Sequence, residues 1–269
     1  MTPEDVALFS QIVKERSGLI LTPEKAYLLE SRLLPIARKQ GLATLEDLAR
    51  QIRHAKTEAL LESITEALTT NETFFFRDTK PFDLLKDLVL PPLIESRASS
   101  RTLRIWCAAA SSGQEPYSIA MILKEMSAKL AGWTIKIVAT DISKEILDKA
   151  KAGRYSQFEV QRGLPITFLV KYFKKDGDSW ALSEDIKKMV DFRFFNLLDN
   201  VTSLGTYDVV FCRNVLIYFD RETKARILNQ TSTMMPADGT LFLGGAETVL
   251  GITDQFKPVA GQRGIYARA

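Results

Sequence analysis

The spacing of apolar residues changes along the chain and divides it into a helical part and a mixed part. Up to about residue 68, apolar residues recur every three or four positions, which is the period of an amphipathic helix. Thr2-Pro3-Glu4 and Thr22-Pro23-Glu24 each combine an N-cap residue, a proline and an acid, so each predicts a helix start. We therefore expect an all-helical domain over residues 1–68, in which Pro35 kinks or splits the second helix.

After residue 68 the pattern leads through a connecting segment into alternating strands and helices. Residues 69–101 predict a loop and then a helix over about 80–97, bent at Pro91-Pro92. From residue 102 onward, short apolar runs predict strands at 103–109, 133–142, 191–196, 207–213 and 240–243, and a closing hairpin at 256–260 and 264–268. This alternation predicts an α/β domain over residues 102–269, with a mostly parallel sheet and an antiparallel edge.

A polar stretch at about 154–192 interrupts this pattern and predicts a small β insertion. It contains a helical segment at 166–173 and an apolar run at 180–182. We expect that run to form a strand that turns back toward the strand at 191–196.

The segment Leu103–Ala120 (LRIWCAAASSGQEPYSIA) predicts a strand, a tight loop of small residues and a helix. Such a turn can hold a ligand at the carboxyl end of the first strand, because small residues allow close approach and the helix start offers free N–H groups. The loop is not a G-x-G-x-x-G motif, since Gly113 is its one glycine. An ordinary turn built for close packing is an equally good interpretation of this segment alone.

Polar residues follow the other predicted strands, at the edge where ligands bind in open α/β sheets. Asp141 ends the second strand, Asn196-Leu197 follow the third and Asn214-Val215 follow the fourth. Ser143 is the better cap for the next helix, which would leave Asp141 free to accept hydrogen bonds from ribose hydroxyls. The chain lacks a G-x-x-x-x-G-K-[ST] motif, so an adenosine-bearing cofactor without a long phosphate tail fits best.

Composition restricts the possible chemistry further. The net charge of +3 over 269 residues requires neither nucleic acid nor an anionic membrane as partner. The single histidine, His54, argues against multi-histidine metal sites and a histidine-dependent nucleophile, so no metal is expected. Cys107 and Cys212 lie within apolar runs and are expected to be buried free thiols. With no run long enough to span a membrane and no secretory pattern at residue 1, we expect a cytoplasmic protein without membrane insertion.

Two further features leave more than one interpretation open. Basic residues on the second helix (Lys25, Arg32, Arg38 and Lys39) fit either a solvated face or a docking face for an acidic partner. The loop Thr69–Asp78 (TTNETFFFRD) fits either a hydrophobic plug between domains or the wall of a site.

Four motifs together resemble the CheR-type chemotaxis protein methyltransferases: TTNETFFFRD, RIWCAAASSGQEPYSIA, IVATDIS and FCRNVLIYFD. The resemblance covers nearly the whole chain and implies a Rossmann-like domain that takes S-adenosylmethionine as methyl donor. It implies that glutamate side chains in the cytoplasmic helical region of chemoreceptors are the acceptors, and that methyl esters and S-adenosylhomocysteine are the products.

The resemblance also implies roles for individual residues. Arg77 and Tyr218 match residues that act near the methyl transfer, and Arg32 and Arg38 match receptor-docking arginines. The family's cofactor contacts fall on Asn71, Thr73, Arg77, Glu115, Asp141, Asn196, Leu197, Asn214 and Val215.

The implied reaction agrees with the residues available. A glutamate carboxylate, with a reference pKa of about 4.3, is already ionised near pH 7 and needs no general base. We therefore expect catalysis by positioning and exclusion of water, with the Phe74–Phe76 run closing the site. The hairpin turn over residues 174–180 is short compared with family members that grip a receptor C-terminal pentapeptide, so we expect methylation without such a tether.

Three alternatives stay open at this point. The chain could be a methyltransferase with a different acceptor, although an RNA enzyme should show a broad basic stripe with exposed aromatics, and the charge here is mixed. It could bind S-adenosylmethionine as a signal without catalysis. The helical domain could serve only as a scaffold for the other domain.

Overall fold

The computed structural model describes residues 1–22 and 27–269, and the chain divides into two compact units. One unit comprises Met1–Thr70 together with Tyr218–Lys224, and the other comprises Asn71–Ile217 with Ala225–Ala269. We call them the helical unit and the sheet unit. The predicted start Thr22-Pro23-Glu24 and the basic residue Lys25 fall largely on residues 23–26, outside the described part.

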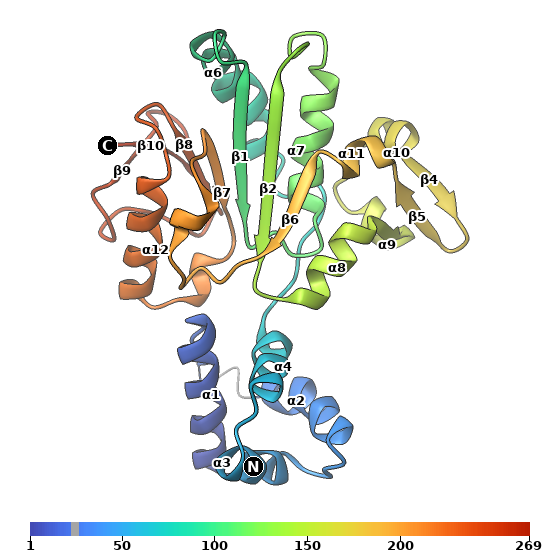
Figure 1. The fold of residues 1–269 in the computed structure, drawn as a ribbon, viewed down its shortest axis with the longest axis vertical. Coiled ribbons are helices and arrows are strands. Elements are labelled where there is room, and N and C mark those ends of the chain that lie inside the picture. The colour runs from blue at the N-terminus through green and yellow to red at the C-terminus, as the bar shows by residue number, and fades with distance from the viewer. Residues whose placement is uncertain (23–26) are drawn as a thin grey trace. The chain divides into compact units, whose positions relative to one another are not determined.

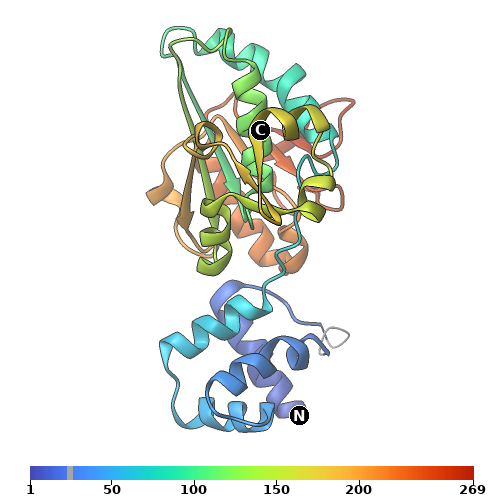
Figure 2. The same ribbon diagram turned by 90° about the vertical axis from the view of Figure 1, so that its right-hand side faces the viewer.

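Within its described residues, the helical unit contains four amphipathic helices, as predicted (Figures 1 and 2). They are α1 (Pro3–Ser17), α2 (Tyr27–Lys39), α3 (Leu45–His54) and α4 (Glu58–Leu68). Helix α1 begins with a capping box in which Thr2 and Asp5 each bind the other's backbone N–H. Helix α2 continues through Pro35, so of the two predicted effects of this proline, a kink or a split, the split does not occur. Fully buried side chains such as Phe9, Leu33 and Ile64 form the core of the unit.

The sheet unit contains a seven-stranded sheet with the order β6-β2-β1-β7-β8-β10-β9. Its strands are β1 (Thr102–Ala108), β2 (Thr134–Asp141), β6 (Val190–Phe194), β7 (Val209–Cys212), β8 (Thr240–Leu243), β9 (Phe256–Pro258) and β10 (Ile265–Arg268). The first five of these pair in parallel, and β9 and β10 form the antiparallel edge, which confirms the predicted architecture. Because β1 has β2 on one side and β7 on the other, the strand order reverses there, and ligands bind at such a point.

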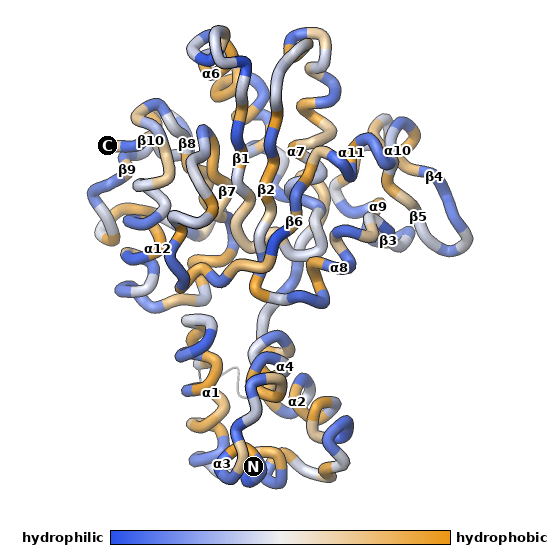
Figure 3. Tube along the Cα trace, in the orientation of Figure 1, coloured by the Kyte–Doolittle hydropathy of each residue, from blue (hydrophilic) through white to orange (hydrophobic). Residues whose placement is uncertain are grey.

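The central strands are buried on both faces, which explains why they read as continuous apolar runs. The indole N–H of the fully buried Trp106 donates to the Thr140 hydroxyl at 3.0 Å. In Figure 3, white and blue segments interrupt the hydrophobic colour along β1 and β2. The flanking helices are α7 (Gln114–Glu125), α8 (Lys144–Ala152), α11 (Glu184–Lys187) and α12 (Arg221–Thr233), with 3₁₀ turns η3 (Val201–Leu204) and η4 (Leu216–Tyr218).

The helix ahead of β1 is irregular in the turn that directly precedes Pro91 and Pro92. Helix α5 (Lys80–Leu84) passes into a π-helical turn, η2 (Leu85–Val89), before α6 (Leu90–Ser96). Pro91 and Pro92 directly follow this turn, and a proline ring clashes with the carbonyl four residues earlier, which here belongs to η2. The irregularity therefore precedes the prolines.

The insertion forms a separate three-stranded antiparallel sheet with the order β3-β5-β4. It contains β3 (Arg154–Ser156), α9 (Gln157–Gln161), α10 (Ile166–Tyr172), β4 (Phe173–Asp176) and β5 (Ser179–Leu182). The expectation that residues 180–182 turn back toward 191–196 was wrong: β5 pairs with β3 and β4, and β6 pairs with β2. Gly177 and Asp178 alone separate β4 from β5, so the hairpin is as short as predicted.

Candidate functional site

The loop between β1 and α7 makes its sharp turn with three residues in the left-handed region. Ala109 has φ = 55°, Ser111 has φ = 51° and Gly113 has φ = 91°. A Cβ at Gly113 would lie 3.1 Å from the side chains of Tyr117, Ala150 and Phe192, so only glycine fits without displacing them. The two non-glycine residues hold a conformation that costs on the order of 1–3 kcal/mol each, and such backbone strain is typical of ligand-binding loops.

Asp141 at the end of β2 fixes this loop from the neighbouring strand. Its Oδ2 accepts a hydrogen bond from the Ser111 N–H at 2.8 Å, and its Oδ1 accepts one from the Ser143 N–H at 3.0 Å. Ser143 caps α8 as predicted, by accepting from Ile146 N–H. The expectation that Asp141 would therefore be free was wrong. These two bonds place the Asp141 carboxylate at the end of β2, beside the loop.

The loop over residues 71–79 is tied to the same edge of the sheet. The Ser111 hydroxyl donates to the Asn71 carbonyl at 2.8 Å, and the Phe76 N–H donates to the Ser118 hydroxyl at 3.0 Å. Arg77 is half-buried, and its Nη1 donates to the Glu72 carbonyl at 2.9 Å. These bonds bring predicted contacts of this loop (Asn71, Thr73 and Arg77) into the same unit as Glu115 and Asp141.

The three consecutive phenylalanines do not act alike. Phe75 is fully buried and packs edge-on against Tyr155 and Phe173, at ring distances of 4.9 and 5.6 Å. Phe76 is also buried, so the idea that the whole run closes a site was wrong: two of the three rings belong to the core. Phe74 remains partly exposed, with the guanidinium groups of Arg77 and Arg162 over its ring.

A buried arginine joins this loop to the start of α7. Arg213 follows β7, its side chain is 1% exposed, and its Nη1 donates to the Glu115 carboxylate at 2.8 Å. Its Nη2 donates to the Asp78 carboxylate at 2.7 Å and to the Arg77 carbonyl at 3.0 Å. Burial raises the pKa of the Glu115 carboxyl, and the adjacent guanidinium opposes that rise.

The remaining predicted contacts follow β6 and β7. Asn196 accepts a hydrogen bond from the Leu198 N–H through its side chain, and Leu197 is buried. Asn214 is in the left-handed region, with φ = 59°, and is half-buried like Val215. The predicted cofactor residues thus follow four neighbouring strands of one sheet or lie in the loop attached to that edge.

Sequence reasoning missed two residues at this edge, Arg213 and Glu247. Arg213 stands within the motif FCRN, and a charge directly after a buried strand is a usable signal. Glu247 follows β8 in the run GGAET, and its carboxylate accepts hydrogen bonds from five backbone N–H groups. Four of these five partners lie 30 to 33 residues earlier in the chain, so only the fold reveals this role.

The predicted receptor-docking residues and Tyr218 belong to the helical unit. Arg32 is half-buried, and its Nη1 donates to the carbonyls of Leu68 and Thr69 at the end of α4. Arg38 is exposed. Tyr218 groups with this unit, and its backbone carbonyl accepts a hydrogen bond from the Ile20 N–H at 2.9 Å.

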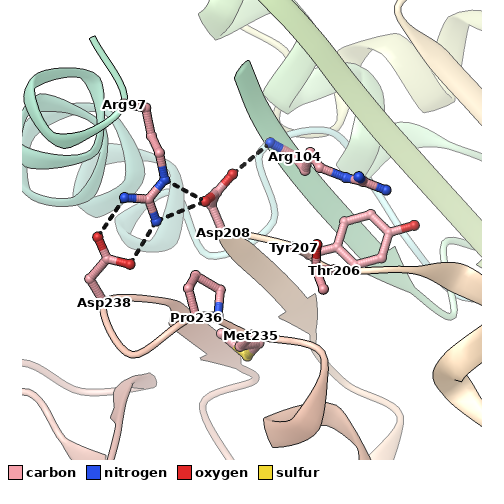
Figure 4. A pocket seen from close by; sticks show the side chains of 8 residues that line it. All are labelled: Arg97, Arg104, Thr206, Tyr207, Asp208, Met235, Pro236 and Asp238. Carbon is pink, nitrogen blue, oxygen red and sulfur yellow. Dashed lines mark hydrogen bonds and ion pairs between the residues drawn. The ribbon is translucent and has the colours of Figure 1, made fainter. Parts of the chain in front are cut away.

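A cavity of about 490 Å³ lies at the amino ends of the strands, away from these residues (Figure 4). Arg97 crosses one side of it and pairs with Asp208 and Asp238. Its guanidinium lowers the pKa of the Asp238 carboxyl. Because Arg97 pairs with both acids that line the cavity, it joins the end of α6 to the turns before β7 and β8.

The described residues contain no group of three or more His, Cys, Asp or Glu side chains placed to hold a metal ion. Both cysteines are free and buried, as predicted. Among the helices that the structure describes, none combines the length and apolar character needed to cross a bilayer.

The fold and the residues along its carboxyl edge define a Rossmann-like methyltransferase that uses S-adenosylmethionine. Residues 71–265 match the family model described as the S-adenosylmethionine-binding domain of CheR methyltransferases, and residues 4–69 match the model of their all-alpha domain. The chain therefore belongs to the CheR methyltransferase family.

Curated relatives match nearly the full length. Chemotaxis protein methyltransferase 1 of Pseudomonas aeruginosa is 42% identical over 269 residues, covering 98% of this chain and 97% of the relative. The chemotaxis protein methyltransferase of Vibrio parahaemolyticus is 41% identical over 260 residues, covering 96% and 94%. Chemotaxis protein methyltransferase Cher2 of Pseudomonas putida is 40% identical and covers 98% of both chains.

Proposed function

We propose that this protein transfers methyl groups from S-adenosylmethionine to glutamate side chains in the cytoplasmic helical region of chemoreceptors, forming methyl esters during chemotactic adaptation. The observation that carries the proposal is the nearly full-length match to relatives named chemotaxis protein methyltransferase. Both parts of the chain take part in that match, so the likeness extends beyond a shared cofactor domain.

We assign the cofactor contacts to the residues gathered at the carboxyl edge of the sheet: Asn71, Thr73, Arg77, Glu115, Asp141, Asn196, Leu197, Asn214 and Val215. The donor set fits the cofactor, since the edge combines a carboxylate held beside a tight turn, side-chain amides and apolar neighbours. S-adenosylmethionine supplies a methyl group on a sulfonium centre, which an oxygen nucleophile can accept. In this assignment Asp141 accepts hydrogen bonds from the ribose hydroxyls.

The protein's own contribution to the reaction is positioning. The acceptor carboxylate is ionised near neutral pH, so no side chain has to remove a proton from it. The Arg77 guanidinium donates one N–H to the Glu72 carbonyl. Because a guanidinium has five N–H donors, it can also bind a carboxylate. We also assign Tyr218 to the methyl transfer, because it matches a family residue that acts near that step. The hydrogen bond from the Arg213 guanidinium to the Arg77 carbonyl supports the loop that carries the Arg77 side chain.

We assign receptor docking to the helical domain, residues 1–68, with residues 69–101 as connection and residues 102–269 as catalytic domain. Arg38 is exposed and can meet an acidic receptor surface directly. Arg32 also binds the last carbonyls of α4, so it both supports that helix and carries positive charge on α2.

We further propose that methylation proceeds without tethering to a receptor C-terminal pentapeptide, because the insertion at residues 154–192 has only two residues between β4 and β5. Calorimetric titration with such a peptide should show no binding. Saturable binding that is lost when the tip of this hairpin is changed, for example by Asp178→Ala, would overturn this part of the proposal.

The decisive experiment is transfer of labelled methyl groups from S-adenosylmethionine to a purified cytoplasmic chemoreceptor fragment. Label that is released as methanol by mild base identifies a glutamyl ester, and a fragment with its acceptor glutamates changed to alanine serves as control. Failure to transfer label despite calorimetric binding of S-adenosylmethionine would refute the proposed acceptor. Asp141→Asn should weaken cofactor binding in the same calorimetric assay.

A further inference from the structure

Glu247 binds the loop after β7 through its buried carboxylate. Its Oε1 accepts hydrogen bonds from the N–H groups of Val215 at 2.9 Å, Leu216 at 2.7 Å and Ile217 at 3.3 Å. Its Oε2 accepts from the N–H groups of Asn214 at 2.8 Å and Gly244 at 2.6 Å. The residue is only 8% exposed, and all of these donors are backbone amides.

This arrangement is an anion-binding loop that is filled by the protein's own side chain. A left-handed residue followed by a helical turn points successive N–H groups at one spot, and such concavities bind anions. Asn214, with φ = 59°, and the 3₁₀ turn η4 provide this geometry directly after β7. The carboxylate of Glu247 therefore stabilises a backbone conformation that the loop would otherwise leave with unsatisfied buried donors.

Gly244 provides a second, independent sign that the carboxylate has a fixed place. A Cβ at this position would lie 2.7 Å from Glu247 Oε2, 2.6 Å from Asn214 Nδ2 and 2.9 Å from the Asn214 backbone nitrogen. Any side chain at residue 244 would thus displace either the carboxylate or the loop it holds. The absence of a side chain at Gly244 therefore leaves the space in which the Glu247 carboxylate binds the loop.

We propose that Glu247 is a positioning residue for the cofactor: it holds Asn214 and Val215 in the conformation that binds the nucleoside. The inference rests on the proposed assignment of these two residues as cofactor contacts. Because Glu247 already uses their N–H groups, the loop offers a ligand its carbonyl oxygens and the Asn214 amide. It is therefore suited to a neutral nucleoside with N–H donors, and it disfavours a phosphate, which would need those N–H groups and would be repelled by the carboxylate.

The test uses the full chain and measures S-adenosylmethionine binding by calorimetry, which requires no receptor. Glu247→Ala should weaken binding by roughly tenfold or more, since it removes charge-assisted hydrogen bonds that hold the loop. Sodium formate, compared with sodium chloride at equal ionic strength, should restore part of the affinity, because formate can occupy the emptied group of N–H donors. Glu95→Ala, which changes an exposed acid, should bind as the unchanged protein does with either salt.

Two further variants keep the test decisive if Glu247→Ala does not fold. Glu247→Gln keeps the shape and one acceptor oxygen but turns an amide toward N–H donors, so it should weaken binding without abolishing the fold. Gly244→Ala should weaken binding through displacement of the carboxylate. Unchanged affinity in the folded variants, or a loss that formate does not relieve in Glu247→Ala, would overturn the proposal. Loss of receptor methylation with normal cofactor binding would instead count against the proposed acceptor.

Discussion

Replacing Arg213 by methionine is expected to destabilise the sheet unit strongly. The substitution keeps most of the apolar volume but leaves the Glu115 carboxylate, 12% exposed, without its cationic partner. Removing one partner of a buried pair costs about 3–5 kcal/mol, whereas Asp78, whose side chain is 51% exposed, should contribute no more than about 1 kcal/mol. For a unit of this size the loss corresponds to a fall in Tm of roughly 6–20 °C.

The loss should depend on pH in a defined direction. Burial raises the pKa of Glu115, and in the variant no guanidinium opposes that rise. Between the ordinary pKa of glutamate and this raised value, the folded state binds more protons than the unfolded state, so stability falls as pH rises. Arg213→Met should therefore be less damaging at about pH 5 than at about pH 8.

Urea unfolding followed by tryptophan fluorescence measures this effect, because Trp106, Trp133 and Trp180 all lie in the sheet unit. Adding Glu115→Gln to the variant removes the stranded charge, and the pair should show a coupling free energy of about 1–3 kcal/mol. Arg193→Met, at an exposed ion pair, is the matched control and should change stability by less than about 1 kcal/mol. A loss below about 1 kcal/mol for Arg213→Met, equal at both pH values, would refute the reasoning.

Four other outcomes are expected. Gly163→Ala should lower the Tm of the sheet unit by several degrees, because φ is +84° and a Cβ would lie 2.1 Å from a backbone carbonyl oxygen; an unchanged calorimetric Tm would contradict the close packing. Asp5→Ala should cost the helical unit about 1–2 kcal/mol by circular dichroism. Hydrogen bonding from the Thr2 backbone N–H lowers the pKa of this acid, so the deficit should be present above the ordinary pKa of aspartate and vanish as the pH falls through the lowered value. Arg77→Ala should reduce turnover roughly tenfold or more with the fold intact, and equal turnover would remove the residue from the mechanism. Arg38→Ala should weaken receptor binding without changing stability, whereas Arg32→Ala should lower both; loss of stability in the former would count against an exposed docking residue.

The order of strands and helices was predictable because strands that are buried on both faces consist mainly of apolar residues. Strands β1, β2 and β7 are nearly continuous apolar runs, and the small residues after β1 indicate a tight turn. Strand β4 gave no such signal: Lys174, Lys175 and Asp176 are exposed, so neither apolar content nor alternation marked it. A short edge strand of this kind is defined by its partner, and pairing is not visible in a single sequence.

The candidate site was predictable as a set of strand-end residues but not as a network. Asp141 could be placed at the rim from its position after a strand, yet its bond to the Ser111 N–H depends on a loop 30 residues earlier. Arg213 and Glu247 were missed for the same reason. Their charges are satisfied by groups that are distant in the chain, and one sequence without its fold does not reveal such pairings.

The segment Tyr218–Lys224 groups with the helical unit although it lies in the middle of the sequence that builds the sheet. The polypeptide therefore leaves the sheet unit after Ile217 and returns to it at Ala225, within α12. A fragment that begins at residue 71 would carry Phe219, 8% exposed in the intact chain, without the helices that accompany it. The helical unit is therefore discontinuous in sequence, and no single cut in the chain separates it whole from the sheet unit.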